Sequence, residues 1–201
     1  MKRVLFLKAV SLVFGLFWLS CAQAIPDNSD ESAQALLPAK AGVILKLVES
    51  ADFVSLSECI HETSGLGFSP YSRNLSKLFI TRFQRDEVAD FGSDDTRYLW
   101  GYYDGIGSPI RLTPKDYFAR FVYDMDFDTK AEKSFLNSNA LRKNADFRAV
   151  YHAYPDSSFV HYHFEGTEEV AFIDFRDLIL IFSEFHGVWY LVGLAHGQST
   201  I

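Results

Sequence analysis

Two apolar segments near the C-terminal end of the chain place the strongest constraint on its fold. Residues 178–182 and 188–192 carry hydrophobic side chains at every position, so both faces of each segment are apolar. A strand of this kind belongs in the centre of a sheet, and we expect helices to cover one side of that sheet. His186 and Gly187 provide a short turn between the two segments, which predicts that they pair as antiparallel neighbours.

The C-terminal part of the sequence, including these two strands, predicts an antiparallel meander. Apolar and polar residues alternate there with the period of two that is typical of strands. The segments that we expect to be strands are 148–154, 159–164, 170–175, 178–185 and 188–195. Successive strands joined by short loops pair in chain order, so these segments predict one curved sheet.

Helical spacing is found earlier in the chain. Residues 44–51 and 53–60 place apolar side chains three and four positions apart, and Asp52 between them is a typical N-cap residue. Thr113 followed by Pro114 is the start signal of a further helix, because proline at the first helical position loses no hydrogen bond. Three helices are therefore predicted ahead of the meander.

These elements predict an α+β fold in which N-terminal helices pack on a curved antiparallel sheet. Residues 97–112 add a hairpin, whose turn 104–107 contains two glycines. We expect residues 41–201 to form a single domain. Residues 25–40 are polar and contain both early prolines, so they are predicted to be a flexible leader into that domain.

The first 24 residues have the pattern of a secretory signal peptide. Lys2, Arg3 and Lys8 are basic, residues 9–19 are mainly apolar, and the small residues around position 23 predict cleavage after Ala24. The apolar stretch is well short of the roughly 20 residues that span a bilayer, so we expect no transmembrane span in the mature chain. We therefore predict a periplasmic or secreted protein.

Two cysteines leave alternatives open. Cys21 follows a small residue at the end of an apolar stretch, so lipidation of Cys21 would make the protein a membrane-anchored lipoprotein instead; Trp18 fits that pattern poorly. Cleavage after Ala24 would leave Cys59 as the only thiol, which most simply is a small buried hydrophobic residue. The alternative is a dimer in which Cys59 pairs two chains.

The net negative charge of the chain argues against anionic partners. The chain has 19 basic and 26 acidic residues, a net charge of −7, and loss of the three basic leader residues would change this to −10. Nucleic acids and anionic lipid surfaces repel such a protein, so we expect neither as a partner. The expected partner is a ligand or protein of the cell envelope that the sequence does not identify.

Histidines form the best candidate site. If residues 154–159 form a hairpin turn, His152 lies opposite His161, and His163 and Glu165 follow on the same face of the strand. Imidazole nitrogens and a carboxylate oxygen are typical Zn²⁺ ligands, so these four residues are a candidate zinc site. The simpler interpretation, which the sequence favours, is a polar sheet face opposite a core face, with no cofactor.

Several motifs resemble those of a family of bacterial exported proteins and lipoproteins of unknown function. They are Gly67-Phe68-Ser69-Pro70-Tyr71, Trp100-Gly101-Tyr102-Tyr103-Asp104-Gly105-Ile106-Gly107-Ser108-Pro109-Ile110, His163-Phe164-Glu165-Gly166, and Trp189-Tyr190-Leu191-Val192-Gly193 with His196. The order of helices and strands is also similar to the superfamily of nuclear transport factor 2 and ketosteroid isomerase, which implies a cone-like α+β fold. Neither resemblance implies a catalytic residue.

The functional expectation follows from strong fold signals without a catalytic motif. We expect an exported cell-envelope protein that binds a ligand or partner and is not an enzyme. The alternative is a pocket enzyme or a metal-dependent activity built on His152, His161 and His163.

Overall fold

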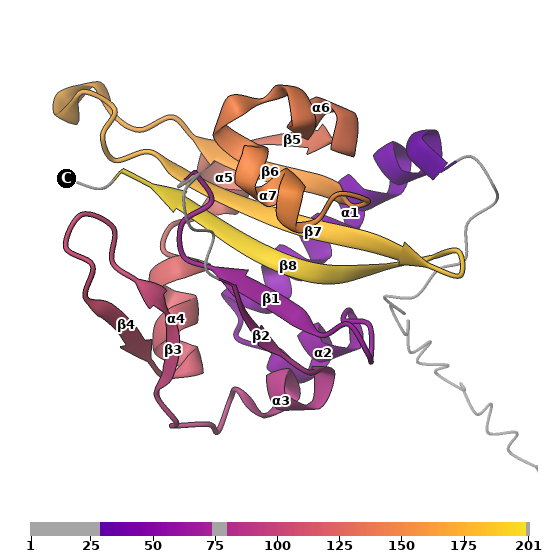
Figure 1. Ribbon diagram of the computed structural model, residues 1–201, viewed down its shortest axis with the longest axis horizontal. Coiled ribbons are helices and arrows are strands. Elements are labelled where there is room, and N and C mark those ends of the chain that lie inside the picture. Colours follow the sequence, from indigo (N-terminus) through magenta and orange to yellow (C-terminus); the bar gives the residue numbers. More distant parts are fainter. Residues whose placement is uncertain (1–28, 74–79, 200–201) are drawn as a thin grey trace, which may run out of the picture.

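The computed structural model describes residues 29–73 and 80–199, and its helices and strands confirm the α+β fold class (Figure 1). The helices are α1 (Ser29–Glu49), α2 (Phe53–Glu58), α3 (Arg85–Asp90), α4 (Pro114–Phe121), α5 (Phe127–Lys130), α6 (Ser138–Lys143) and α7 (Arg148–Ala153), with short 3-10 turns η1 (Ala145–Phe147) and η2 (Glu168–Val170). The strands are β1 (Leu66–Ser69), β2 (Thr81–Phe83), β3 (Tyr98–Tyr102), β4 (Pro109–Leu112), β5 (Glu132–Leu136), β6 (Ser158–Phe164), β7 (Arg176–Phe185) and β8 (Val188–Gln198).

Six strands form one mixed sheet in the order β2-β1-β8-β7-β6-β5. β5 to β8 are an antiparallel meander; β6, β7 and β8 confirm the predicted strands at 159–164, 178–185 and 188–195, whereas β5 was not predicted. The sheet is not wholly antiparallel as predicted, because β1 pairs with β8 in parallel. β3 and β4 pair separately, which confirms the predicted hairpin over residues 97–112.

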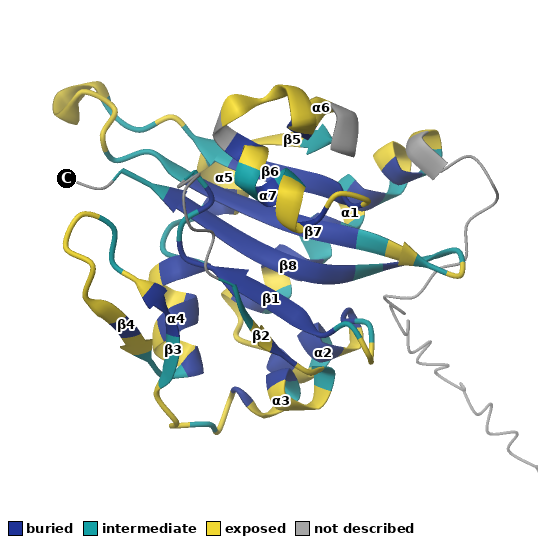
Figure 2. Cartoon of the chain, in the orientation of Figure 1, coloured by how far each residue is buried: buried dark blue, intermediate teal, exposed yellow. Residues whose placement is uncertain are grey.

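The sheet is covered on both faces, whereas the sequence predicted helices on one. On one face, side chains such as Leu178 and Leu180 of β7 join a large core that includes α1, α2 and α4. On the other, Ile179 and Ile181 belong to a smaller core with residues of α6 and α7. Figure 2 shows α6 and α7 lying beside β6 and β7. Alternate side chains of β7 thus enter different cores, which explains why this strand is apolar at successive positions.

The second face of the sheet is covered because residues 148–153 form a helix. The prediction of a strand at 148–154 was therefore wrong. This segment forms α7 and the residue that follows it. Val150 and Tyr154 are buried and lie four positions apart, which is helical spacing and brings both side chains to the sheet. The alternation of apolar residues in this segment therefore does not reflect a strand.

The prediction of a strand at 170–175 was also wrong. Residues 168–170 form η2, and the chain then continues as an irregular loop before β7 begins at Arg176. Val170, Phe172 and Ile173 are exposed, so the alternation in this segment does not reflect a buried sheet face.

The predicted flexible leader over 25–40 is corrected from Ser29 onward, where α1 begins. Ala33 and Leu37 are fully buried, so this part of the chain packs against the core as a helix. Pro38 lies inside α1 and does not end it, because buried residues on both sides of it hold the helix to the sheet. Residues 25–28 lie outside the described ranges.

Local start and turn signals are confirmed. Asp52 caps α2 by accepting a hydrogen bond from the Ser55 amide at 3.1 Å, and Thr113 caps α4 in the same way. His186 and Gly187 both have positive φ angles in the turn between β7 and β8, as a tight hairpin requires. No helix within residues 29–73 and 80–199 is both long enough and apolar enough to cross a membrane.

Candidate functional site

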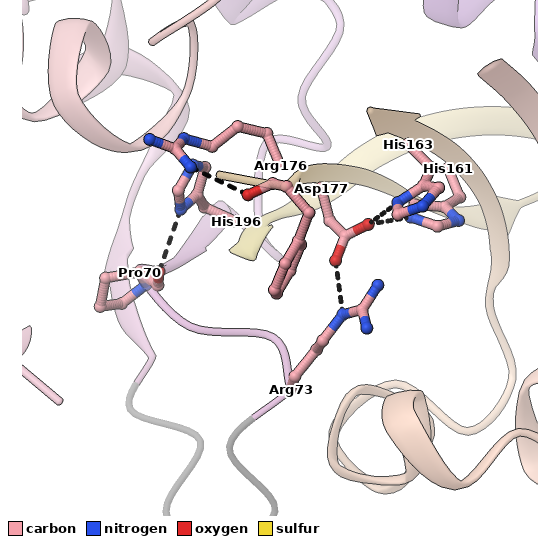
Figure 3. A network of polar contacts seen from close by, with 8 residues as sticks. Pro70, Arg73, His161, His163, Arg176, Asp177 and His196 are labelled. Carbon is pink, nitrogen blue, oxygen red and sulfur yellow. Dashed lines mark hydrogen bonds and ion pairs between the residues drawn. The ribbon is translucent and has the colours of Figure 1, made fainter. Parts of the chain in front are cut away.

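The structure brings together two of the four predicted metal ligands and adds a third residue. Within the described ranges, the one group of at least three His, Cys, Asp or Glu side chains close enough to hold a metal ion is His161, His163 and Asp177 (Figure 3). One ligand atom from each lies within 4.8 Å of the others. His152 is exposed on α7 and Glu165 is exposed beyond the end of β6, and neither belongs to the group.

The register of the sheet explains this change of partner. The prediction that His152 opposes His161 is wrong, because β6 pairs with β5 and β7 and residue 152 is in a helix. His163 lies opposite Asp177 on β7, and His161 lies opposite Ile179. His161 and His163 are two positions apart on β6, so their side chains point to the same face of the sheet. Asp177 lies opposite His163 and points to that face as well.

The Asp177 carboxylate is the centre of the cluster. Its Oδ1 atom accepts hydrogen bonds from His161 Nε2 at 2.8 Å and from His163 Nδ1 at 2.7 Å. The Asp177 side chain has no exposed surface and the His161 side chain is 10% exposed, whereas His163 is 32% exposed. His163 is therefore the most exposed of these three residues.

A segment from outside the β6–β7 hairpin completes the cluster. Arg73 follows β1, and its Nε atom donates to Asp177 Oδ2 at 2.6 Å. Its guanidinium group also lies 4.5 Å from the centre of the Phe175 ring. The amide of Ser72 donates to the carbonyl of His196 on β8, which holds this segment beside the sheet. Four segments of the chain thus position the cluster.

These donors keep Asp177 ionised. Burial by itself raises the pKa of Asp177, but hydrogen bonds from His161 and Arg73 and the positive charge of Arg73 outweigh burial and hold the pKa well below its usual value. The cluster therefore offers a buried carboxylate ion at neutral pH.

Gly197 provides the space that the carboxylate occupies. It lies opposite Asp177 in the pairing of β7 with β8. A Cβ atom at position 197 would lie 2.6 Å from Asp177 Oδ2 and 2.9 Å from Ser72 Oγ, closer than such atoms pack. A side chain at this position is therefore incompatible with the observed position of the carboxylate.

A second polar cluster lies on the other face of the same end of the sheet. Asp124 Oδ2 accepts from Arg176 Nε at 2.7 Å and lies 3.3 Å from His196 Nε2. His196 Nδ1 donates to the Pro70 carbonyl at 3.3 Å (Figure 3). Burial raises the pKa of Asp124, but the adjacent His196 ring and the hydrogen bond from Arg176 outweigh burial and lower the pKa. This cluster fastens the end of α4 and the segment after β1 to the sheet.

The cysteine predictions remain untested. Cys21 and the cleavage site after Ala24 lie outside the described residues, so lipidation and cleavage stay predictions. Cys59 follows α2 and its side chain has no exposed surface. Cys59 is not a free thiol in the structure, so the predicted disulfide between two chains through Cys59 would require exchange of its present bond as well as movement of the residues around α2.

Asp177 and Arg73 are the two site residues that sequence analysis missed. The available signal was Asp177 itself, a charged residue directly before the apolar run 178–182. A carboxylate in such a position is buried and needs partners, and β6 is the preceding strand in the meander. Nothing in the sequence pattern links Arg73 to this hairpin, because it lies 104 residues from Asp177.

Comparison of the chain with protein-family models, curated proteins and solved structures finds no match. The resemblances to a family of exported proteins and to the nuclear transport factor 2 superfamily therefore stay predictions. The function of the cluster has to be inferred from its own geometry and chemistry.

Proposed function

We propose that this protein is a binding protein of the cell envelope and that it holds one divalent transition-metal ion, Zn²⁺ first among them, between His161, His163 and Asp177. The observation that supports the proposal is the approach of three ligand atoms of suitable type to within 4.8 Å of one another. Two imidazole nitrogens and one carboxylate oxygen form a donor set that suits zinc and neighbouring first-row metals. The export signal predicted for residues 1–24 supports the envelope location.

The distances place the three ligand atoms near a single metal position. Ligand atoms about 2.0–2.1 Å from a metal ion are roughly 3.3 Å apart in the tetrahedral geometry that zinc prefers. Asp177 Oδ1 lies 2.8 Å from His161 Nε2 and 2.7 Å from His163 Nδ1, so both contacts would lengthen by roughly half an ångström on zinc binding. All three ligand atoms already lie within 4.8 Å of one another.

Protons must leave the contacting nitrogens when the metal binds. A carboxylate ion only accepts hydrogen bonds, so His161 Nε2 and His163 Nδ1 carry hydrogen in the structure described above. In the metal-bound form the proton of each ring lies on its other nitrogen or is released to solvent. Zinc affinity is therefore expected to fall as the pH is lowered.

Arg73 acts in the outer shell of the proposed site. Its bond to Asp177 Oδ2 fixes the direction of the carboxylate and leaves Oδ1 directed at the histidines. Hydrogen bonds of this kind orient metal ligands and change the affinity for the metal about 10–100-fold.

The alternative function is a metal-dependent activity at the same site. Three protein ligands leave coordination positions for solvent, as in catalytic zinc sites, and His163 is 32% exposed. A water molecule on the metal would then be the reactive group. Metal binding is common to both functions and is therefore tested first.

The test is a calorimetric titration of the tag-free protein with Zn²⁺. We expect one zinc ion per chain for the wild type, and a decrease in affinity of more than about tenfold for His163→Ala. His152→Ala is the matched control, because His152 is an exposed histidine outside the cluster, and it should bind zinc as the wild type does. Circular dichroism checks that both variants fold.

Two results would refute the proposal. One is the absence of saturable zinc binding by the folded wild-type protein. The other is equal affinity in the wild type and His163→Ala. In either case the cluster would be a structural network in which Arg73 and the two histidines neutralise a buried carboxylate.

A further inference from the structure

The loop between β6 and β7 carries an unusual group of exposed apolar side chains. Val170 is 43% exposed, Phe172 46% and Ile173 47%, and these are three of the six large hydrophobic residues that are exposed in the described part of the chain. We refer to Glu168–Ile173 as the β6–β7 apex. It projects beyond the end of the sheet, away from both cores (Figures 1 and 2).

The apex is held in shape by its own hydrogen bonds. The Asp174 carboxylate accepts from the Thr167 amide at 2.7 Å and from the Thr167 hydroxyl at 3.1 Å. The amide of Phe172 donates to the Thr167 carbonyl at 2.8 Å. These bonds close the base of the loop, so the apolar side chains are presented by an ordered backbone.

The backbone of the apex is strained at its most apolar point. Ala171 has a φ angle of 52° and Phe172 a φ angle of 61°, in the left-handed region that disfavours bulky side chains. Such strain persists where the surrounding structure enforces it, and it is concentrated at functional positions. A glycine or asparagine would fit this backbone with less strain, whereas a phenylalanine exposes an aromatic ring.

Charge around the apex restricts what can cover it. Glu165, Glu168 and Glu169 are exposed beside the apolar residues, and the sequence from 165 to 175 contains no lysine or arginine. Three carboxylates next to the apolar side chains oppose insertion into an anionic lipid surface. They complement an apolar pocket whose rim is basic.

We propose that the β6–β7 apex is a docking element that inserts Phe172, flanked by Val170 and Ile173, into an apolar pocket of a protein partner whose rim carries lysine or arginine. Aromatic residues that fill a desolvated pocket contribute most of the energy of many interfaces. The preformed loop lowers the entropy that ordering it on binding would otherwise cost. This proposal does not depend on metal binding.

The first test is photo-crosslinking in cells that produce the protein naturally. A photoreactive phenylalanine replaces Phe172 in one variant and Val54 in the control, because Val54 is 63% exposed on α2 and far from the apex in sequence. We expect position 172, and not position 54, to crosslink to one protein. The crosslinked peptide should be apolar and contain lysine or arginine.

The second test measures binding of that protein after purification. Phe172→Ser should lower the affinity about tenfold or more. Replacement of Glu168 and Glu169 by lysine should slow association and reduce its dependence on salt. Val54→Ser should bind as the wild type does, and all variants should keep the circular dichroism spectrum of the wild type.

Other outcomes would overturn the proposal. Crosslinking of position 172 to a second copy of this chain would make the apex a self-association surface. Crosslinking to lipid would make it a membrane contact. The absence of crosslinks at position 172, or equal affinity of the Phe172→Ser variant for the purified partner, would show that the apex is not a docking element.

Discussion

Substitution of Gly197 by alanine tests the packing beneath the candidate site. Gly197 lies opposite Asp177, and an added Cβ atom would lie 2.6 Å from Asp177 Oδ2, 2.9 Å from Asp177 Cβ and 2.9 Å from Ser72 Oγ. The φ angle of Gly197 is outside the left-handed region, so alanine meets no backbone penalty there. The unfavourable part of the effect of Gly197→Ala is therefore steric and is directed at the carboxylate and at the segment that carries Arg73.

The expected magnitude follows from overpacking. An additional methyl group in a well-packed site costs roughly 1–3 kcal/mol. For a domain of this size, 1 kcal/mol lowers the midpoint of thermal unfolding by about 2–4 °C, so Gly197→Ala should unfold about 2–12 °C below the wild type. Displacement of Asp177 should also weaken zinc binding, since one ligand is moved away from the two histidines.

Gly42→Ala is the matched control for this prediction. Gly42 lies inside α1, and a Cβ atom there would meet nothing within 4 Å. Alanine in a helix interior is more favourable than glycine by roughly 0.5–1 kcal/mol, so Gly42→Ala should unfold at a higher temperature than the wild type. Thermal unfolding followed by circular dichroism measures both variants. Stabilisation by Gly197→Ala would refute the described position of Asp177, and zinc affinity unchanged by it would refute Asp177 as a metal ligand.

Three further predictions concern single interactions. Asp177→Asn should lower the free energy of unfolding at pH 7 by roughly 2–4 kcal/mol, measured by chemical unfolding. The pKa of Asp177 is lower in the folded state than in the unfolded state, so the wild type loses this stability as the pH falls below about 4. The difference in stability between the wild type and the variant should therefore shrink below that pH. Thr113→Ala removes the cap that accepts from the Asp116 amide at 3.2 Å and should cost about 1 kcal/mol in the same assay, whereas an unchanged midpoint would show that the cap does not stabilise α4. Gly187→Ala places a Cβ atom at a φ angle of 79° in the β7–β8 turn and should cost about 1 kcal/mol or more, and a gain in stability would contradict the described turn.

Local chemistry in the sequence was sufficient to predict several elements. Asp52 and Thr113 mark helix starts because their side chains satisfy backbone amides that have no partner within the helix. The turn at His186-Gly187 is predictable because few residues adopt positive φ angles in a two-residue loop. In each case the information lies within a few residues of the feature.

Elements that depend on distant contacts were not predictable in this way. Residues 148–154 alternate in polarity and also carry Val150 and Tyr154 at helical spacing, and only packing on the sheet decides between the two patterns. Exposed Phe172 gave residues 170–175 the appearance of a strand, since a pattern does not show which residues are buried. The start of α1 was missed because Pro38 suggested a break where the core holds the helix together.

Only the two histidines of the candidate site were predictable, because only their positions depend on local sequence. His161 and His163 share a face because they are two positions apart on one strand, which needs no knowledge of the fold. Their third partner depends on register, and a wrong neighbouring strand led to His152 in place of Asp177. Arg73 reaches the cluster only because β1 joins β8 in parallel and the chain continues beside it.

X-ray absorption at the zinc edge of the protein loaded with one equivalent of Zn²⁺ tests the proposed site most directly. The geometry predicts a first shell of nitrogen and oxygen only, at about 2.0–2.2 Å, with the scattering of two imidazole rings. His163→Ala should lose one of these rings, and His152→Ala should keep both. A sulfur ligand at about 2.3 Å, or a spectrum that His163→Ala leaves unchanged, would contradict a metal site formed by His161, His163 and Asp177.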